Sequence, residues 1–190
     1  MFPRYGTIFS KYSKSANTPD LAVTACHLAL EEFWRKFQSH FSLAKFMFAG
    51  TAITGPTSVP VTGTIGGFNL ATQLSIPPEK YIKTQLHASV DPFIGLFNLF
   101  SYTISMSAWQ VDCKAGGFTT PMPAKLMADF TVQALAFKKK MFSLAPNTHE
   151  AAMEIMSDGV EECMKTCINI VPYTGVAGAT TLTGTITIQF

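Results

Sequence analysis

The sequence has 190 residues, of which 47% are hydrophobic and 14% are charged, and its net charge at neutral pH is +2. Soluble domains ordinarily carry about 25% charged residues, so this chain is short of the side chains that keep the surface of a monomer hydrated. The near-neutral charge, with Lys138-Lys139-Lys140 as the only basic run, argues against nucleic acid as a specific partner.

A first helix is predicted to begin at Asn17-Thr18-Pro19-Asp20. We expect Asn17 at the N-cap and the carboxylate of Asp20 beside the free amides of the first turn. Apolar residues then recur at steps of three and four, which is typical of a helix with one buried face: Cys26, Leu30, Phe33, Trp34, Phe37 and Phe41. A Thr/Gly-rich segment follows, in which Thr54-Gly55 leads to Val61-Thr62-Gly63-Thr64-Ile65, and we expect an extended arm there.

The middle of the chain, from about residue 77 to residue 123, is predicted to be an insert bounded by turns at Pro77-Pro78 and at Gly116-Gly117. Residues 92–111 are apolar enough that they must be compared with the length and composition of a transmembrane helix. Polar residues interrupt this stretch, and it barely reaches the roughly 20 residues that a bilayer span needs. A buried helix or a pair of strands is therefore expected, with a membrane-associated protein using residues 92–111 as an alternative.

Two further helices are predicted to form a helical hairpin over residues 125–170. The first runs from about Lys125 to Met141, and the second opens at Asn147-Thr148-His149-Glu150, with Asn147 at the N-cap. The second helix carries its own apolar stripe, which is formed by Met153, Met156, Val160, Cys163, Met164 and Cys167. Thr174-Gly175 then leads to Leu182-Thr183-Gly184-Thr185-Ile186, where alternating threonines predict a strand.

The order of a capped helix, the letters TG and the letters TGTI thus occurs twice, over residues 17–65 and 147–186. We interpret residues 1–190 as one structural domain of the α+β class, with several packed helices, short Thr/Gly-rich β segments and an internal helix-plus-arm repeat. The two repeat units are predicted to superpose.

The sequence contains no recognisable catalytic motif: GxSxG, HExxH, the P-loop and the dinucleotide fingerprint are all missing. The four histidines are scattered, and the four cysteines form neither a CxxC pair nor a disulfide framework. Cys163 and Cys167 are expected to be buried, reduced thiols. We therefore predict no enzyme activity, no cofactor and no metal. The alternative is an enzyme whose site is assembled from dispersed residues, in which His27 or His87 lies beside an acidic side chain with a perturbed pKa.

Two sets of residues are candidates for contacts between subunits. An acidic stripe of Glu150, Glu154, Asp158 and Glu161 or Glu162 lies next in sequence to Lys138-Lys139-Lys140. These charges are predicted to pair across the helical hairpin or between subunits, or simply to form a solvated face. No charge follows Lys165, so residues 172–190 are predicted to add an extended edge to a neighbouring subunit. The contacts expected there involve Thr183, Thr185, Ile186 and Ile188.

A capped helix followed by a TG and TGTI arm, present twice in a charge-poor chain, resembles virion structural proteins of tailed bacteriophages, in particular small tail, neck or baseplate components. The resemblance covers residues 17–22 with 54–65 and residues 147–152 with 174–186. It implies a homo-oligomeric subunit of a viral particle that is made in the host cytoplasm. Its partners would be copies of itself and other virion proteins, without a membrane, and no catalytic residues come with it.

Overall fold

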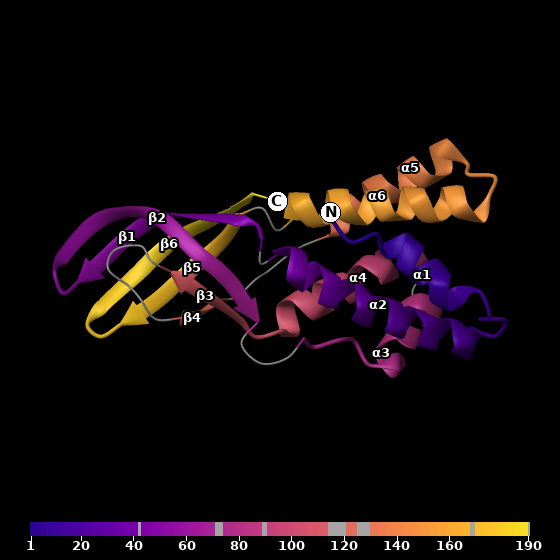
Figure 1. The fold of residues 1–190 in the computed structure, drawn as a ribbon, viewed down its shortest axis with the longest axis horizontal. Helices are drawn as coiled ribbons and strands as arrows, with labels where there is room; N and C mark the ends of the chain where they lie inside the picture. Colours follow the sequence, from indigo (N-terminus) through magenta and orange to yellow (C-terminus); the bar gives the residue numbers. More distant parts are fainter. Residues whose placement is uncertain are drawn as a thin grey trace.

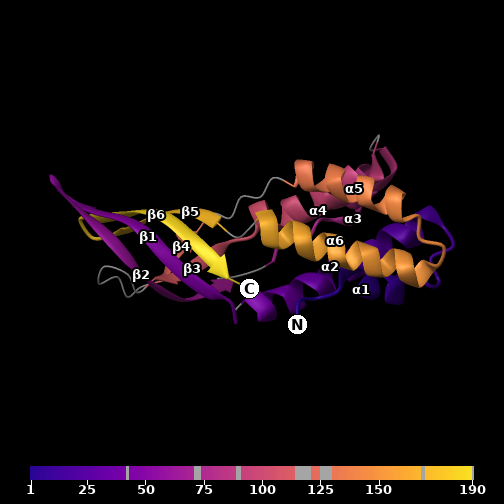
Figure 2. The ribbon, with the colours of Figure 1, turned by 90° about the horizontal axis from the view of Figure 1, so that it is seen from above.

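In the computed structural model, helices occupy one end of the molecule and a curled β-sheet occupies the other (Figures 1 and 2). The structure describes residues 1–41, 43–70, 74–88, 91–113, 121–124, 130–167 and 170–189. The fold is α+β, as predicted. The N-terminus and the end of the last strand both lie near the junction between the two ends.

The elements follow one another in a repeating order, two helical segments and then a β-hairpin, three times. Unit 1 contains α1 (Tyr5–Ser13), α2 (Pro19–Phe41), β1 (Lys45–Thr54) and β2 (Thr57–Leu70). Unit 2 contains α3 (Glu79–Lys83), which continues into the π-helix η1 (Thr84–Ala88), then α4 (Pro92–Met106), β3 (Trp109–Cys113) and β4 (Pro121–Ala124). Unit 3 contains α5 (Thr131–Leu144), α6 (His149–Cys167), β5 (Ile170–Ala177) and β6 (Thr180–Gln189).

The three units are joined in a cycle. The described strands form one antiparallel sheet in the order β4-β3-β2-β1-β6-β5, and the edge strands β4 and β5 also contact each other. In the helical end, α2 contacts α3, α4 contacts α5, and α6 returns to contact α1. Each unit therefore contacts the next unit both in the helical end and in the sheet. Unit 3 contacts unit 1 in both places as well.

The two predicted repeat segments, residues 17–65 and 147–186, lie within units 1 and 3 and leave out the first helix of each. Residues 77–123, which the sequence sets apart as an insert, contain the helices and the first strand of unit 2 in the same order. The TGTI letters lie in the second strand of a hairpin in both units 1 and 3. The TG letters do not match in this way: Gly55 lies at the β1–β2 turn with φ 55°, whereas the corresponding turn of unit 3 contains Gly178 with φ 59°. Superposition of the two units stays a prediction.

The second helix of every unit begins at a side chain that caps it. The Thr18 hydroxyl accepts a hydrogen bond from the backbone N–H three residues on at 3.2 Å, and Thr148 does the same at 3.1 Å. In unit 2 the carboxylate of Asp91 accepts from the N–H two residues on at 3.0 Å. The prediction of Asn17 and Asn147 as caps was therefore wrong by one residue, because the threonine hydroxyl is the group that reaches the free amide.

Apolar periodicity located the helical core correctly. All six residues of the predicted stripe on α2 are buried. On α6, Val160, Cys163 and Met164 are buried and Met156 is half-buried, while the side chain of Cys167 lies outside the described residues. The prediction for α5 was less accurate. That helix extends to Leu144, residues 125–129 lie outside the described residues, and its apolar residues Val132 and Leu135 are exposed.

The inner face of the curled sheet is built around Phe48, which is 2% exposed. Gly50 of β1 lies directly opposite Gly184 of β6. A Cβ atom at Gly184 would lie 2.9 Å from the Phe48 ring and 2.6 Å from the Gly50 Cα atom. The two glycines therefore leave the space that the aromatic ring fills, which is a specific reason for the glycine in the second TGTI sequence.

The two helices of unit 1 are joined by the carboxylate of Glu32. It accepts hydrogen bonds from Lys11 Nζ at 2.8 Å and from the Tyr12 hydroxyl at 2.7 Å, and it pairs with Lys36 of its own helix at 2.7 Å. These bonds, led by that of Lys11, lower the pKa of Glu32 from 4.5 to about 2. A carboxylate with a lowered pKa stabilises the fold above its unfolded pKa, and this contribution is lost as the pH falls through the folded pKa.

We therefore expect Glu32→Gln to remove part of the acid sensitivity of the protein. The wild-type free energy of unfolding should fall by about 1–2 kcal/mol more than that of the variant between pH 5 and pH 2, allowing for solvent screening. Urea unfolding at a series of pH values measures this. Glu31→Gln is the matched control, because Glu31 pairs with Arg35 within α2. Equal pH dependence of wild type and Glu32→Gln would contradict the expectation.

Candidate assembly surface

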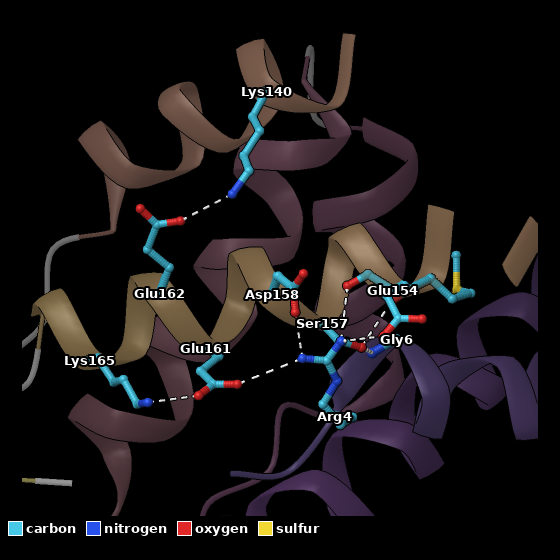
Figure 3. Close-up of polar contacts among 10 residues, drawn as sticks. Arg4, Gly6, Lys140, Glu154, Ser157, Asp158, Glu161, Glu162 and Lys165 are labelled. Atoms are coloured by element: carbon cyan, nitrogen blue, oxygen red, sulfur yellow. Dashed lines mark hydrogen bonds and ion pairs between the residues drawn. The ribbon is translucent and has the colours of Figure 1, made fainter. Parts of the chain in front are cut away.

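The predicted acidic stripe of α6 lies against the N-terminal segment of the chain (Figure 3). The guanidinium group of Arg4 donates a hydrogen bond to Glu154 at 3.1 Å and another to Asp158, and it lies 3.8 Å from the carboxylate of Glu161. Glu161 also pairs with Lys165 at 2.7 Å. Most of the stripe therefore neutralises a cation of the same chain.

Next to this cluster the backbones of α1 and α6 come into direct contact. The N–H of Gly6 donates a hydrogen bond to the hydroxyl of Ser157 at 3.0 Å, and Ser157 is fully buried. A Cβ atom at Gly6 would lie 2.9 Å from that hydroxyl and would overlap the Met153 carbonyl group. Only glycine fits at this position, so α1 and α6 close the helical ring at a van der Waals distance.

The two other junctions between units also carry an ion pair. Lys83 Nζ lies 2.7 Å from Asp20, where α3 meets α2, and Lys138 pairs with Asp91, where α5 meets α4. The hydrogen bond from each lysine lowers the pKa of its partner carboxyl. At all three junctions the acid lies in the second helix of one unit or directly before it, and the base lies in the first helical segment of the next unit or directly before it.

The predicted charged contacts are thus largely used within the chain. Lys140 pairs with Glu162 at 3.4 Å across the α5–α6 hairpin, which agrees with the prediction of pairing there. Lys138 instead reaches α4, and Lys139 and Glu150 are exposed. Arg4, Gly6 and Asp91 were not among the residues predicted from the sequence to make contacts. For Asp91 a signal was present, because Asp91-Pro92 resembles the Thr18-Pro19 helix start.

The C-terminal segment is not a free arm, so the prediction that residues 172–190 extend a neighbour's sheet was wrong for this fold. β6 pairs with β1 on one side and with β5 on the other, which satisfies both of its hydrogen-bonding edges. Ile186 and Ile188 are buried on the inner face of the chain's own sheet. Thr183 and Thr185 point to the opposite, outer face, where Thr185 is exposed.

The outer face of strands β1, β2, β5 and β6 carries few charges. The sequences of β1, β2, β5 and β6 contain a single charged residue, Lys45 at the start of β1. Ile53, Thr181 and Val176 form one row across three strands of this face, and Ile53 and Val176 are 39% and 64% exposed. Met47, which is 53% exposed, lies farther along β1 on the same face. We define these residues together with Thr183 and Thr185 as the outer sheet surface.

The alternative of an enzyme named His27 or His87 beside an acid with a perturbed pKa. Lys83 is the main cause of the lowered pKa of Asp20, and the charge of His87 adds a smaller contribution, but Asp20 and His87 are both exposed. The Nδ1–H group of His27 donates a hydrogen bond to the Pro77 carbonyl oxygen at 3.1 Å. Cys26 and Cys163 are buried thiols, whereas the side chains of Cys113 and Cys167 lie outside the described residues. Among the residues described, no group of three or more His, Cys, Asp or Glu side chains is placed to hold a metal ion, and no helix is long and apolar enough to cross a membrane.

Comparison with known proteins gives no relative from which a function can be transferred. No protein-family model, no curated protein and no solved structure matches the chain.

Proposed function

We propose that this protein is a structural subunit of a viral particle, a small tail, neck or baseplate component, that binds copies of itself and other virion proteins through the outer sheet surface. The proposal gives the protein no catalytic role. It places the protein in the virion after synthesis in the host cytoplasm.

The observation that carries the proposal is the contrast between the two ends of the molecule. The helical end carries most of the charges, and many of them form ion pairs within the chain. The outer sheet surface presents threonines and exposed apolar side chains with Lys45 at its margin. Protein interfaces are depleted of charged residues at their centre, and exposed apolar patches on soluble proteins mark contact sites.

The cyclic fold supplies a second argument. The three strands that carry this surface are held in the hydrogen-bonded order β1-β6-β5, so the surface is a preformed platform. Binding to a preformed platform orders few additional residues, which lowers the entropic cost of association.

Lysine substitutions test the surface directly. Ile53→Lys and Val176→Lys place a charge in the exposed cross-strand row, where the side chain has room and the fold is expected to survive. Sedimentation equilibrium should show self-association of the wild type, and each variant should weaken it by at least about tenfold, because burying an unpaired charge in an interface is costly. Leu135→Lys is the matched control, since Leu135 is 49% exposed on α5, outside the sheet.

Two results would count against the proposal. One is a wild-type protein that stays monomeric at high concentration and forms no regular assembly under the electron microscope. The other is a loss of self-association in Leu135→Lys as large as that in the two sheet variants. If mass spectrometry does not find the protein in purified viral particles, the viral role is excluded. The proposal of self-association would not be affected by that result.

A further inference from the structure

A cavity of about 190 Å³ lies inside the helical end of the molecule. Its lining comes from α1, α2, η1, α4 and α6, so each of the three units contributes to the wall. Three lining residues are buried, namely Tyr5, Cys26 and Leu96. The other four lining residues are half-buried: Phe9, Leu86, Phe93 and Met156.

The wall of this cavity is almost entirely apolar. Its two polar groups are the Tyr5 hydroxyl and the Cys26 thiol, and these lie 3.6 Å apart in hydrogen-bond contact with each other. Burial raises the pKa of Cys26 to about 11, so the thiol is neutral at physiological pH. A charged ligand would lose its hydration here without compensation, whereas an apolar ligand would lose nothing.

The cavity is large enough for a small molecule. Apolar cavities of about 150 Å³ remain free of water and accept benzene or xenon. One wall is formed by η1, a single π-helical turn that carries Leu86 and is held against α4 by a 2.9 Å hydrogen bond from Asn98 to Gln85. Turns of this kind are rare and occur frequently at functional sites.

We propose that this cavity is a binding site for a small apolar ligand, an aromatic ring or the end of an alkyl chain, which enters between Phe9, Leu86, Phe93 and Met156. The site lies in the helical end and does not depend on the outer sheet surface. Experiments can therefore refute self-association without refuting ligand binding, and the reverse.

Benzene is the probe for the first test. Saturating benzene should raise the melting temperature of the wild-type protein by about 2–4 °C, because a ligand that binds the folded state stabilises it by mass action. Leu86→Trp places a larger side chain at the half-buried wall and should abolish the shift. Leu135→Trp on the exposed face of α5 is the matched control and should keep it. A wild type without a shift, or an equal shift in Leu86→Trp, would overturn the proposal.

The Cys26 thiol provides a second test that needs no variant. Methylmercury should react with Cys26 in the folded protein, and benzene should slow that reaction at least threefold. Peptide mass spectrometry follows Cys26 separately, with Cys163, which is buried between α5 and α6, as the internal reference. The rate at Cys163 should not respond to benzene. Equal protection of both thiols, or protection of neither, would contradict a ligand site at Cys26.

Discussion

Replacing Gly6 with alanine is expected to destabilise the protein by about 3 kcal/mol, the upper end of the usual cost of overpacking. The direction of the change in the free energy of unfolding is informative, because the same substitution in an unconstrained helix stabilises it by about 1 kcal/mol. Here the new methyl group would overlap the Met153 carbonyl group and would lie 2.9 Å from the Ser157 hydroxyl. The helices α1 and α6 would have to separate, which opens the ring where unit 3 meets unit 1.

Urea unfolding, with the slope checked for two-state behaviour, measures this effect. Thr7→Ala is the matched control, since it also raises helix propensity in α1, at an exposed position. It should change the free energy of unfolding by less than about 0.5 kcal/mol. A Gly6→Ala variant at least as stable as the wild type would show that the two helices are not in backbone contact.

Replacing Gly184 with valine is expected to cost about 3 kcal/mol or more and to disrupt the curled sheet first. β-propensity alone predicts the reverse, since valine is favoured and glycine disfavoured in strands. The first atom of the new side chain would already lie 2.6 Å from the Gly50 Cα atom and 2.9 Å from the Phe48 ring. The backbone of β1 cannot move away as a flexible side chain can. The pairing of β1 with β6 must therefore be disrupted.

Thr185→Val, one residue along the same strand, is the control. Thr185 is exposed on the outer sheet surface, so valine there should be tolerated within about 0.5 kcal/mol. Near-UV circular dichroism reports the packing of the aromatic side chains together, and thermal unfolding gives the stability. If Gly184→Val and Thr185→Val both have the melting temperature of the wild type, the close approach of β1 and β6 at Gly50 and Gly184 is refuted.

The sequence predicted best what depends on neighbouring residues. The stripe from Cys26 to Phe41 repeats at helical spacing within one element, so its burial follows from local periodicity. The alternation of Thr183, Thr185 and Ile186 likewise gave a strand with two unlike faces. The helix starts were located to within one residue, because asparagine and threonine are both good caps and stand side by side at both sites.

What the sequence did not predict depends on residues far apart along the chain. Arg4 meets Glu154 and Asp158, and nothing near Arg4 indicates those partners. The pairing of residues 172–190 was assigned to a neighbouring subunit, because alternation predicts a strand but not which strand pairs with it. Unit 2 was taken for an insert, since its hairpin begins at Trp109 and contains no TGTI sequence.

The pairing of β1 with β6 has a consequence for synthesis of the protein. Phe46 pairs with Ile188, so β1 leaves the ribosome long before its partner exists, on the order of 10 s or more at ordinary translation rates. During that interval the apolar face that includes Phe48 has only β2 beside it. Contacts between such distant residues also form slowly. The nascent chain therefore presents an aggregation-prone surface until its last strand emerges, and its yield in a host should depend on chaperones that hold unit 1 until then.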